Sequence, residues 1–287
     1  MDNKDIVEQI KFIGKTYDIW PERNKGQNFL INIGVVDEMI AAADLSGDDE
    51  VLEVGPGLGI LTEGLIGKAK RVVSVELDNK IFGFLKIKFA EIANLELVNG
   101  DILKFNPANY DLKSNVYKII ANLPYNITSF FLKTYLTGDF RPESMTLLLQ
   151  KEVAQRICAG PGKMSLLAIS VQLYGEPKII GYVGKNNFWP KPEVDSAIIK
   201  IDRIKNPSLV DNYLDGISEK EFWRLVKIGY SAKRKQLQHN LAAGLKQPAV
   251  EIKKLLISAN FNDKIRAEKL SVSDWIRLAK KLKNHFN

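Results

Sequence analysis

Apolar residues in the first two hundred positions gather in short runs that stop at a glycine or a polar side chain. Runs rich in valine, isoleucine and leucine predict buried strands, because β-branched side chains fit a covered, pleated surface. The first four predicted strands cover residues 51–54, 71–75, 95–98 and 116–121. Elsewhere the apolar residues recur at every third or fourth position, which predicts helices. These helices cover residues 1–20, 33–43, a segment from about residue 60, 129–137, 153–157 and 166–174.

The later part of the chain adds three strands and then changes character. The additional predicted strands cover residues 145–149, 178–183 and 194–201, and the last two predict an antiparallel pair around a proline-containing loop. The alternation predicts an α/β fold with a mostly parallel sheet of seven strands and an antiparallel terminal pair. From Ser218 onward only helices are predicted, at residues 222–230, 234–245, 250–258 and 272–285. We therefore expect a first domain at residues 1–206, with an N-terminal extension at 1–25, and a small all-helical domain at 207–287.

The fourth predicted strand ends at Asn122-Leu123-Pro124-Tyr125. Pro124 lacks an N–H and has a fixed φ, so the chain leaves the sheet there in a defined direction. Open α/β sheets hold their ligands at the carboxyl ends of the strands. The Asn122 amide oxygen and the Leu123 carbonyl are two acceptors suited to an exocyclic amino group, and the Tyr125 ring suits stacking on a base. The structural alternative is a strand followed by a proline turn with a core tyrosine.

The ends of the first three strands carry groups suited to a nucleoside. The first strand runs into Gly55-Pro56-Gly57-Leu58-Gly59, where glycines let the backbone pass close to a ligand. The third glycine of the dinucleotide fingerprint is missing, because Ile60 stands there, and the G-x-G-x-G spacing is common in S-adenosylmethionine (SAM) enzymes. Glu76 is placed to accept from ribose hydroxyls, and Asp101 to accept from an adenine amino group. Either acid alone could cap the next helix, but the ordered set predicts a nucleoside-binding edge.

Composition narrows the class of protein. Of the 287 residues, 45% are hydrophobic and 26% charged, which is typical of a globular protein. No apolar run reaches the length of a membrane span, and the first residues lack a secretory signal, so we expect a cytoplasmic protein without membrane contact. The formal charge of +7 favours a polyanionic partner. The single cysteine, Cys158, excludes an internal disulfide, and with His239 and His285 far apart we expect no metal.

Two further segments complete an ordered set of motifs. One is Gly26-Gln27-Asn28-Phe29-Leu30, where Gln27 and Asn28 offer side-chain hydrogen bonds to the start of the helix at 33–43. The other is Phe188-Trp189-Pro190-Lys191-Pro192-Glu193-Val194-Asp195-Ser196. Together with residues 53–62, 75–76, 100–103 and 122–127, they resemble the small-subunit (16S-type) rRNA adenine N6,N6-dimethyltransferases (KsgA-type), which are class I SAM-dependent methyltransferases with a Rossmann-like sheet. The resemblance covers nearly the whole chain. Asn24-Lys25 and Asn32 depart from the family pattern, so the resemblance does not fix the helix cap.

The resemblance implies a site and a reaction. The implied SAM-binding residues are Asn28, Leu30, Gly55, Gly57, Glu76, Asp101 and Asn122. The implied catalytic group is Asn122, Leu123, Pro124 and Tyr125, with Phe188 as a second ring, so that the target adenine lies between two aromatic side chains. The implied reaction dimethylates N6 of two adjacent adenines near the 3′ end of small-subunit rRNA. The partner is then this rRNA or the pre-assembled small subunit, and we expect a monomer.

The basic residues Lys233, Arg234 and Lys235 are candidates for phosphate contacts, with a solvated helix face as the alternative. Two other functions share part of the pattern. A resistance-type methyltransferase of large-subunit rRNA has the same cofactor motifs, but residues 231–235 and 266–270 favour the small-subunit family. A non-catalytic assembly factor could keep the fold, although the intact Glu76, Asp101 and Asn122–Tyr125 favour an enzyme.

Overall fold

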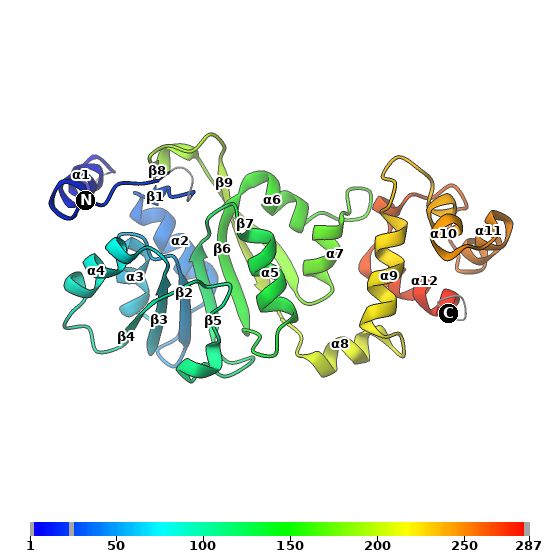
Figure 1. Cartoon of the computed structure of the whole chain (residues 1–287), viewed down its shortest axis with the longest axis horizontal. Coiled ribbons are helices and arrows are strands. Elements are labelled where there is room, and N and C mark those ends of the chain that lie inside the picture. Colours follow the sequence, from blue (N-terminus) through cyan, green and yellow to red (C-terminus); the bar gives the residue numbers. More distant parts are fainter. Residues whose placement is uncertain (1–2, 23–25, 284–287) are drawn as a thin grey trace. The chain divides into compact units, whose positions relative to one another are not determined.

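The computed structural model describes residues 3–22 and 26–283 and shows two compact units (Figure 1). Unit 1 comprises Met1–Gln155 and Gly175–Ile204, and unit 2 comprises Arg156–Tyr174 and Lys205–Asn287. The expected division into domains at residues 206 and 207 stays a prediction. No helix in the described ranges has both the length and the apolar character needed to cross a bilayer.

Unit 1 is built on a seven-stranded sheet with the order β4-β3-β2-β5-β6-β9-β7. Its strands are β2 (Glu50–Val54), β3 (Arg71–Glu76), β4 (Leu95–Asn99), β5 (Lys118–Asn122), β6 (Ser144–Gln150), β7 (Glu176–Val183) and β9 (Ser196–Asp202). Neighbours from β4 to β6 run parallel, whereas β9 is antiparallel to both β6 and β7. The predicted sheet and its antiparallel pair are confirmed. The chain runs outward from β2 to β3 and β4, and then returns to β5 on the other side of β2. A topological switch point therefore lies between β2 and β5.

Most helices of unit 1 follow the predicted segments, but α4 was not predicted. The helices of this unit are α1 (Asn3–Tyr17), α2 (Ile33–Ala43), α3 (Ile60–Ile66), α4 (Asn79–Lys88), α5 (Thr128–Thr137) and most of α6 (Lys151–Ile157), with short 3₁₀ turns at Pro107–Tyr110 and Lys185–Asn187. Helix α1 packs its buried Ile6 and Ile10 in an apolar cluster with Ile81, Phe84 and Leu85 of α4. The first helix therefore belongs to the core of unit 1.

The cap of α2 differs from the expected one. Asn32 caps the helix, because its Oδ1 accepts a hydrogen bond from the Gly34 N–H at 2.8 Å. The expectation that Gln27 and Asn28 bond to the helix start is wrong, because strand β1 (Phe29–Leu30) separates them from it. β1 pairs antiparallel with β8 (Phe188–Trp189) in a two-stranded sheet that was not predicted. Two-residue strands are too short to show a period in the sequence.

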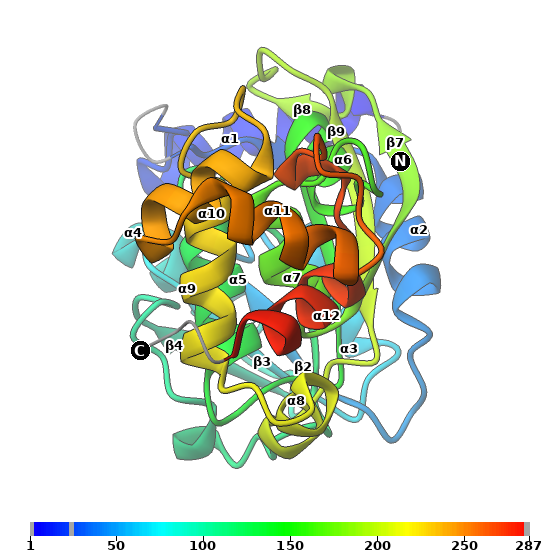
Figure 2. The ribbon, with the colours of Figure 1, turned by 90° about the vertical axis from the view of Figure 1, so that its right-hand side faces the viewer.

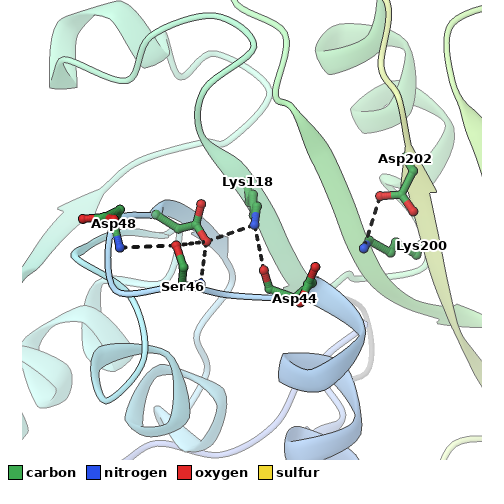
Figure 3. Close-up of polar contacts among 7 residues, drawn as sticks. Asp44, Ser46, Asp48, Lys118, Lys200 and Asp202 are labelled. Atoms are coloured by element: carbon green, nitrogen blue, oxygen red, sulfur yellow. Dashed lines mark hydrogen bonds and ion pairs between the residues drawn. The ribbon is translucent and has the colours of Figure 1, made fainter.

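A polar network joins the amino ends of β2 and β5. Lys118 Nζ, at the start of β5, donates to the Asp44 carbonyl and to Asp49 Oδ2, both at 2.9 Å (Figure 3). The Ser46 hydroxyl also donates to Asp49 Oδ2, at 3.0 Å. Burial alone would raise the pKa of Asp49, but the hydrogen bonds from Ser46 and Lys118 hold it below its usual value. The network therefore holds together the amino ends of β2 and β5, which lie at the edge of the sheet opposite to the switch point.

The described residues of unit 2 form helices joined by loops, without a strand (Figure 2). Its helices are α7 (Leu166–Gln172), α8 (Pro207–Leu214), α9 (Glu219–Gly229), α10 (Leu237–Leu245), α11 (Ala249–Ser258) and α12 (Val272–Leu282), with a 3₁₀ turn at Ala267–Lys269. The prediction of only helices after residue 218 is confirmed for the residues described, and the expected end of the last helix at His285 lies outside them. The fully buried Trp275 of α12 anchors the core, since its ring lies against Gly229 of α9.

The predicted helix at 234–245 begins only at Leu237. Residues 231–236 form a loop between α9 and α10, because the buried Asn240 amide bonds back across it. Asn240 Nδ2 donates to the carbonyls of Gly229 at 2.6 Å and Ala232 at 3.1 Å. The turn at Ala232 is closed further by the Lys235 N–H, which donates to the Ala232 carbonyl at 3.1 Å.

Candidate active site

A cavity of about 1030 Å³ lies in unit 1, beside the carboxyl ends of β2, β3 and β5. Its wall contains most of the residues selected from the sequence: Asn28, Leu30, Gly55, Gly57, Glu76, Asp101, Asn122, Leu123, Pro124 and Tyr125. They come together because parallel strands present their carboxyl ends at one edge of a sheet. The cavity is therefore the candidate active site.

The glycine-rich loop has a backbone that other residues would strain. Gly55, Gly57 and Gly59 have φ values of 62°, 58° and 84°, in the left-handed region. A Cβ atom at Gly59 would lie 2.7 Å from the Phe89 ring, and one at Gly57 would lie 3.2 Å from the Phe29 ring. At Gly55 a Cβ atom would meet nothing within 4 Å. The loop thus turns tightly against the core and leaves open space beside Gly55.

Glu76 is a buried carboxylate in the cavity wall. Its Oε1 accepts from the Asp78 N–H at 2.8 Å, and the carboxylate also accepts from the Gly57 N–H. Burial raises the pKa of Glu76 to about 7, against the opposing effect of these backbone hydrogen bonds. The same group therefore joins the glycine loop to the end of β3 and provides acceptor oxygens in the cavity.

Asp101 does not cap a helix, because a turn follows it at residues 102–104. Its Oδ1 accepts from the Leu103 N–H at 3.0 Å, which closes the turn after β4. The side chain is half-buried and lines the cavity, so its carboxylate also contributes acceptor capacity there.

A second buried acid, Glu53 on β2, was quoted from the sequence only as part of the glycine motif. Its Oε2 accepts from the Thr62 and Ser74 hydroxyls, both at 2.8 Å. Its Oε1 has no hydrogen-bond partner among the described residues. Burial raises the pKa of Glu53 to about 7. The sequence could have indicated this residue, because an acid inside an apolar strand, two positions before a glycine loop, is unusual. In the structure, the Glu53 side chain joins β2, β3 and α3.

Asn122 and Tyr125 both line the cavity and are half-buried. Asn122 Nδ2 donates to the Asn28 carbonyl at 3.4 Å, so the amide oxygen is the acceptor that this side chain can offer to a ligand. The Tyr125 hydroxyl shares a hydrogen bond of 3.0 Å with the Ser196 hydroxyl. The Leu123 N–H donates to the Leu148 carbonyl at 3.2 Å, which extends the sheet contact one residue beyond β5.

The remaining selected residues lie elsewhere. Phe188 is 3% exposed and packs in the core with Leu30, Val183 and Ile198, and it is not part of the cavity wall. Its ring therefore does not face Tyr125 across the cavity in this structure. Lys233, Arg234 and Lys235 are exposed in the α9–α10 loop of unit 2.

Sequence reasoning missed one wall of the cavity. Residues of α1 line it, namely Ile6, Gln9, Ile10, Phe12 and Ile13. Phe12 is 68% exposed, which is unusual for a large aromatic side chain and is explained here by its place at the cavity. Leu77, next to Glu76, is 66% exposed in the same wall. The amphipathic spacing in residues 1–20 indicated the helix but not what it covers.

Metal ligands do not gather anywhere in the described parts of the chain: no group of three or more His, Cys, Asp or Glu side chains is placed to hold an ion. His285 lies outside these residues. The cavity wall combines carboxylate and amide acceptors with apolar side chains.

Comparison with known proteins gives a consistent result. Residues 22–284 match the family model of the ribosomal RNA adenine dimethylases. A protein of Dehalococcoides mccartyi named ribosomal RNA small subunit methyltransferase A is 41% identical over 273 residues, covering 95% of this chain and 92% of its own. The Clostridium perfringens protein of the same name is 35% identical over the full length of both.

Two solved structures resemble this chain over most of its length. The dimethyladenosine transferase of Plasmodium falciparum aligns with a TM-score of 0.76 and 26% identity, covering 90% of this chain and 98% of that protein. The 23S rRNA methyltransferase ErmE aligns with a TM-score of 0.70 and 26% identity, covering 89% of this chain and all of that protein. The fold is thus shared with a dimethyladenosine transferase and with a 23S rRNA methyltransferase.

Proposed function

This chain belongs to the ribosomal RNA adenine dimethylase family, and we propose that it uses SAM to dimethylate N6 of two adjacent adenines near the 3′ end of small-subunit rRNA. The relatives named ribosomal RNA small subunit methyltransferase A support this choice of substrate. The observation that carries the proposal is that one cavity holds both the nucleoside-binding groups and Asn122–Tyr125. A cofactor and a base can therefore meet there.

The cavity fits SAM. The open space beside Gly55 admits a ligand against the backbone, the buried Glu76 offers oxygens to ribose hydroxyls, and Asp101 offers oxygens to an adenine amino group. Leu30 and Leu77 add apolar surface. When bound, SAM supplies an electrophilic methyl group, which is the demanding part of the chemistry.

The chain's own contribution is to position the nucleophile. Adenine N6 is a weak nucleophile because its lone pair is delocalised into the ring. We assign the Asn122 amide oxygen and the Leu123 carbonyl as acceptors for the N6 hydrogens, which turns the nitrogen lone pair toward the methyl group. Alignment of this kind contributes up to about 7–11 kcal/mol in well-oriented systems. The alkylated amine is acidic enough to lose its proton to water, so the motif needs an amide and not a general base.

Tyr125 is the proposed stacking surface for the target base. Its ring lines the cavity directly after Pro124, which fixes where the chain leaves β5. The second ring expected from the resemblance, Phe188, would have to leave its buried place in β8 to stack on the other face. Tyr125 alone therefore carries the stacking part of the proposal.

Unit 2 is proposed to contact the RNA backbone. The three exposed cations Lys233, Arg234 and Lys235 lie side by side in the α9–α10 loop, where they can neutralise phosphates. The partner in this proposal is small-subunit rRNA, free or in the pre-assembled subunit, and the place of action is the cytoplasm.

Methyl transfer to ribosomal particles tests the function directly. Purified protein and radiolabelled SAM are incubated with small subunits from cells that lack this methylation, with already methylated small subunits and free large-subunit rRNA as controls. The proposal predicts four methyl groups for each under-methylated subunit, two on each adenine, and none on the controls. Label in large-subunit rRNA would indicate the resistance-type activity, and tight subunit binding without label would indicate a non-catalytic assembly factor.

A further inference from the structure

We propose that Ser196 is a positioning residue for methyl transfer: its buried hydroxyl holds the Tyr125 ring at the wall of the cavity. This inference rests on the function proposed above for Tyr125. Ser196 ends the motif that begins at Phe188, and neither the stacking role nor the SAM site gives it a task.

The contact joins two distant parts of the chain. Tyr125 Oη and Ser196 Oγ lie 3.0 Å apart and are separated by 71 positions in the sequence. Tyr125 lies beyond the end of β5, outside the sheet, whereas Ser196 is the first residue of β9 and has no exposed surface. A residue of the rigid sheet thus contacts the far end of a side chain from the loop.

Ser196 is itself held from several directions. It pairs with Gln150 of β6 on one side and Val183 of β7 on the other. The preceding Asp195 accepts from the Lys151 N–H through its carbonyl at 3.0 Å, and from the Lys185 N–H through Oδ1 at 3.1 Å. The hydroxyl at position 196 is therefore a fixed point relative to the strand ends.

Tyr125 lies on a segment that is held less firmly than Ser196. After Pro124 the chain leaves the sheet, and the backbone around Tyr125 is held by long hydrogen bonds from the Thr128 hydroxyl, at 3.5 Å to the Pro124 carbonyl and 3.4 Å to the Tyr125 carbonyl. The ring is only half-buried, so packing covers one part of it and the cavity the rest. A bond at the hydroxyl restrains swinging of the ring about Cα–Cβ, away from the base-binding position, which lowers the entropy lost when the base stacks.

The same contact explains why a tyrosine stands here. A phenylalanine ring would stack equally well, so the hydroxyl is not needed for stacking itself. Burial raises the pKa of Tyr125, so the phenol stays neutral and available as a hydrogen-bond partner. The hydroxyl therefore acts as the anchor of the ring.

A double-mutant cycle on Tyr125→Phe and Ser196→Ala tests the inference, because each substitution removes the same bond from one side. We expect each single variant to lower kcat for the under-methylated small subunit by about tenfold, with little change in the Kd for SAM measured by calorimetry. The double variant should be no slower than the slower single variant. Additive losses, or a loss confined to SAM binding, would overturn the proposal.

The control is Thr146→Val on the neighbouring strand β6. Thr146 is 1% exposed, and its hydroxyl has no hydrogen-bond partner among the described residues, so this variant removes a buried hydroxyl without removing a bond. It should keep wild-type kcat. Thermal unfolding of all variants identifies any loss that comes from lower stability, and a loss of kcat that follows the melting temperature would count against positioning.

A second readout does not depend on methyl transfer. In protein with ¹³C-labelled tyrosine, the Tyr125 ring signal is assigned by its absence in Tyr125→Phe. Because Oη lies on the Cβ–Cζ axis, its bond to Ser196 restrains swinging of the whole ring about Cα–Cβ and not flipping of the ring. We therefore expect larger-amplitude ring motion, seen as lower order parameters, in Ser196→Ala and no change in Thr146→Val. An unchanged ring in Ser196→Ala would overturn the inference even if the wild-type protein methylates rRNA, whereas failure of the wild-type protein to methylate would refute the proposed function and leave the ring measurement valid.

Discussion

The side-chain amide of Asn122 donates a hydrogen bond to the backbone carbonyl of Asn28, across 94 positions of sequence. One residue ends the central strand β5, and the other belongs to the segment just before β1. The bond engages the amide nitrogen of Asn122 and leaves its oxygen as the acceptor, which is the atom that the proposed function assigns to the target amino group. The orientation of this side chain is thus set before any base is bound.

This orientation predicts the behaviour of two substitutions at Asn122. Asn122→Ala removes the acceptor, and Asn122→Asp keeps an acceptor but cannot donate to the Asn28 carbonyl. We expect both to lower kcat by about 100-fold, because the nucleophile is no longer aligned, while affinity for the small subunit stays near that of the wild type. Single-turnover methylation and filter binding measure the two quantities. Equal losses in both would contradict the positioning role.

The buried acids Glu53 and Glu76 predict a pH dependence of stability. Their folded-state pKa values are raised from 4.5 to about 7, so between these values the folded chain binds more protons than the unfolded chain. The free energy of unfolding should therefore fall as pH rises from about 4.5 to about 7, by up to about 3 kcal/mol for each group. Thermal melts of the SAM-free protein across this range measure the slope.

Glu53→Gln is the matched variant for this effect, because it keeps the shape and the acceptor for Thr62 and Ser74. Its melting temperature should depend less on pH than that of the wild type. A slope as steep as the wild-type slope would show that Glu53 ionises in the folded state as it does in the unfolded chain.

We expect helix α1 to contribute to SAM affinity, although it lies outside the matched family region, which begins at residue 22. Phe12 lines the cavity yet is largely exposed, so a ligand can cover its ring. Phe12→Ala should raise the Kd for SAM several-fold with no loss of melting temperature, since little of this side chain is buried in the protein alone. Lys15→Ala, also exposed on α1 but not in the cavity wall, is the control and should bind SAM normally.

The basic loop predicts a salt-dependent effect on RNA binding. Replacing Lys233, Arg234 and Lys235 by alanine should weaken binding to the small subunit and flatten its dependence on salt, by about one unit of logarithmic slope for each lost phosphate contact. Calorimetric affinity for SAM should stay unchanged, because these residues lie in unit 2. Lys220→Ala on α9 removes one exposed positive charge outside the loop, and an equal effect per charge would contradict a specific role of the loop.

The sequence was most informative about residues at the carboxyl ends of parallel strands, because the topology of the sheet determines where those residues lie. The glycine loop, Glu76, Asp101 and Asn122 could be placed together because each follows a recognisable strand, and parallel topology brings those ends to one edge. The pairing of β1 with β8 could not be predicted, since it depends on two short segments that are far apart in the chain. The same pairing buries Phe188, and so changes what a motif alone suggests about that ring.

Side-chain hydrogen bonds explain the other differences. The apolar rhythm at 234–245 is continuous, but the start of α10 is set by Asn240, whose amide reaches back to Gly229 and Ala232. A polar residue that is 4% exposed in the middle of a helix gives no period that could indicate this bond. Likewise, the place of α1 at the cavity depends on its packing against α4, which amphipathic spacing does not specify.

For the proposed RNA contact, the two hydrogen bonds of Asn240 bear on the entropy lost on binding. A loop tied to the helix behind it spends little time in conformations that point its cations elsewhere. In the proposed contact with RNA, such a loop loses less backbone entropy than a disordered basic tail that has to order itself on the ribosome.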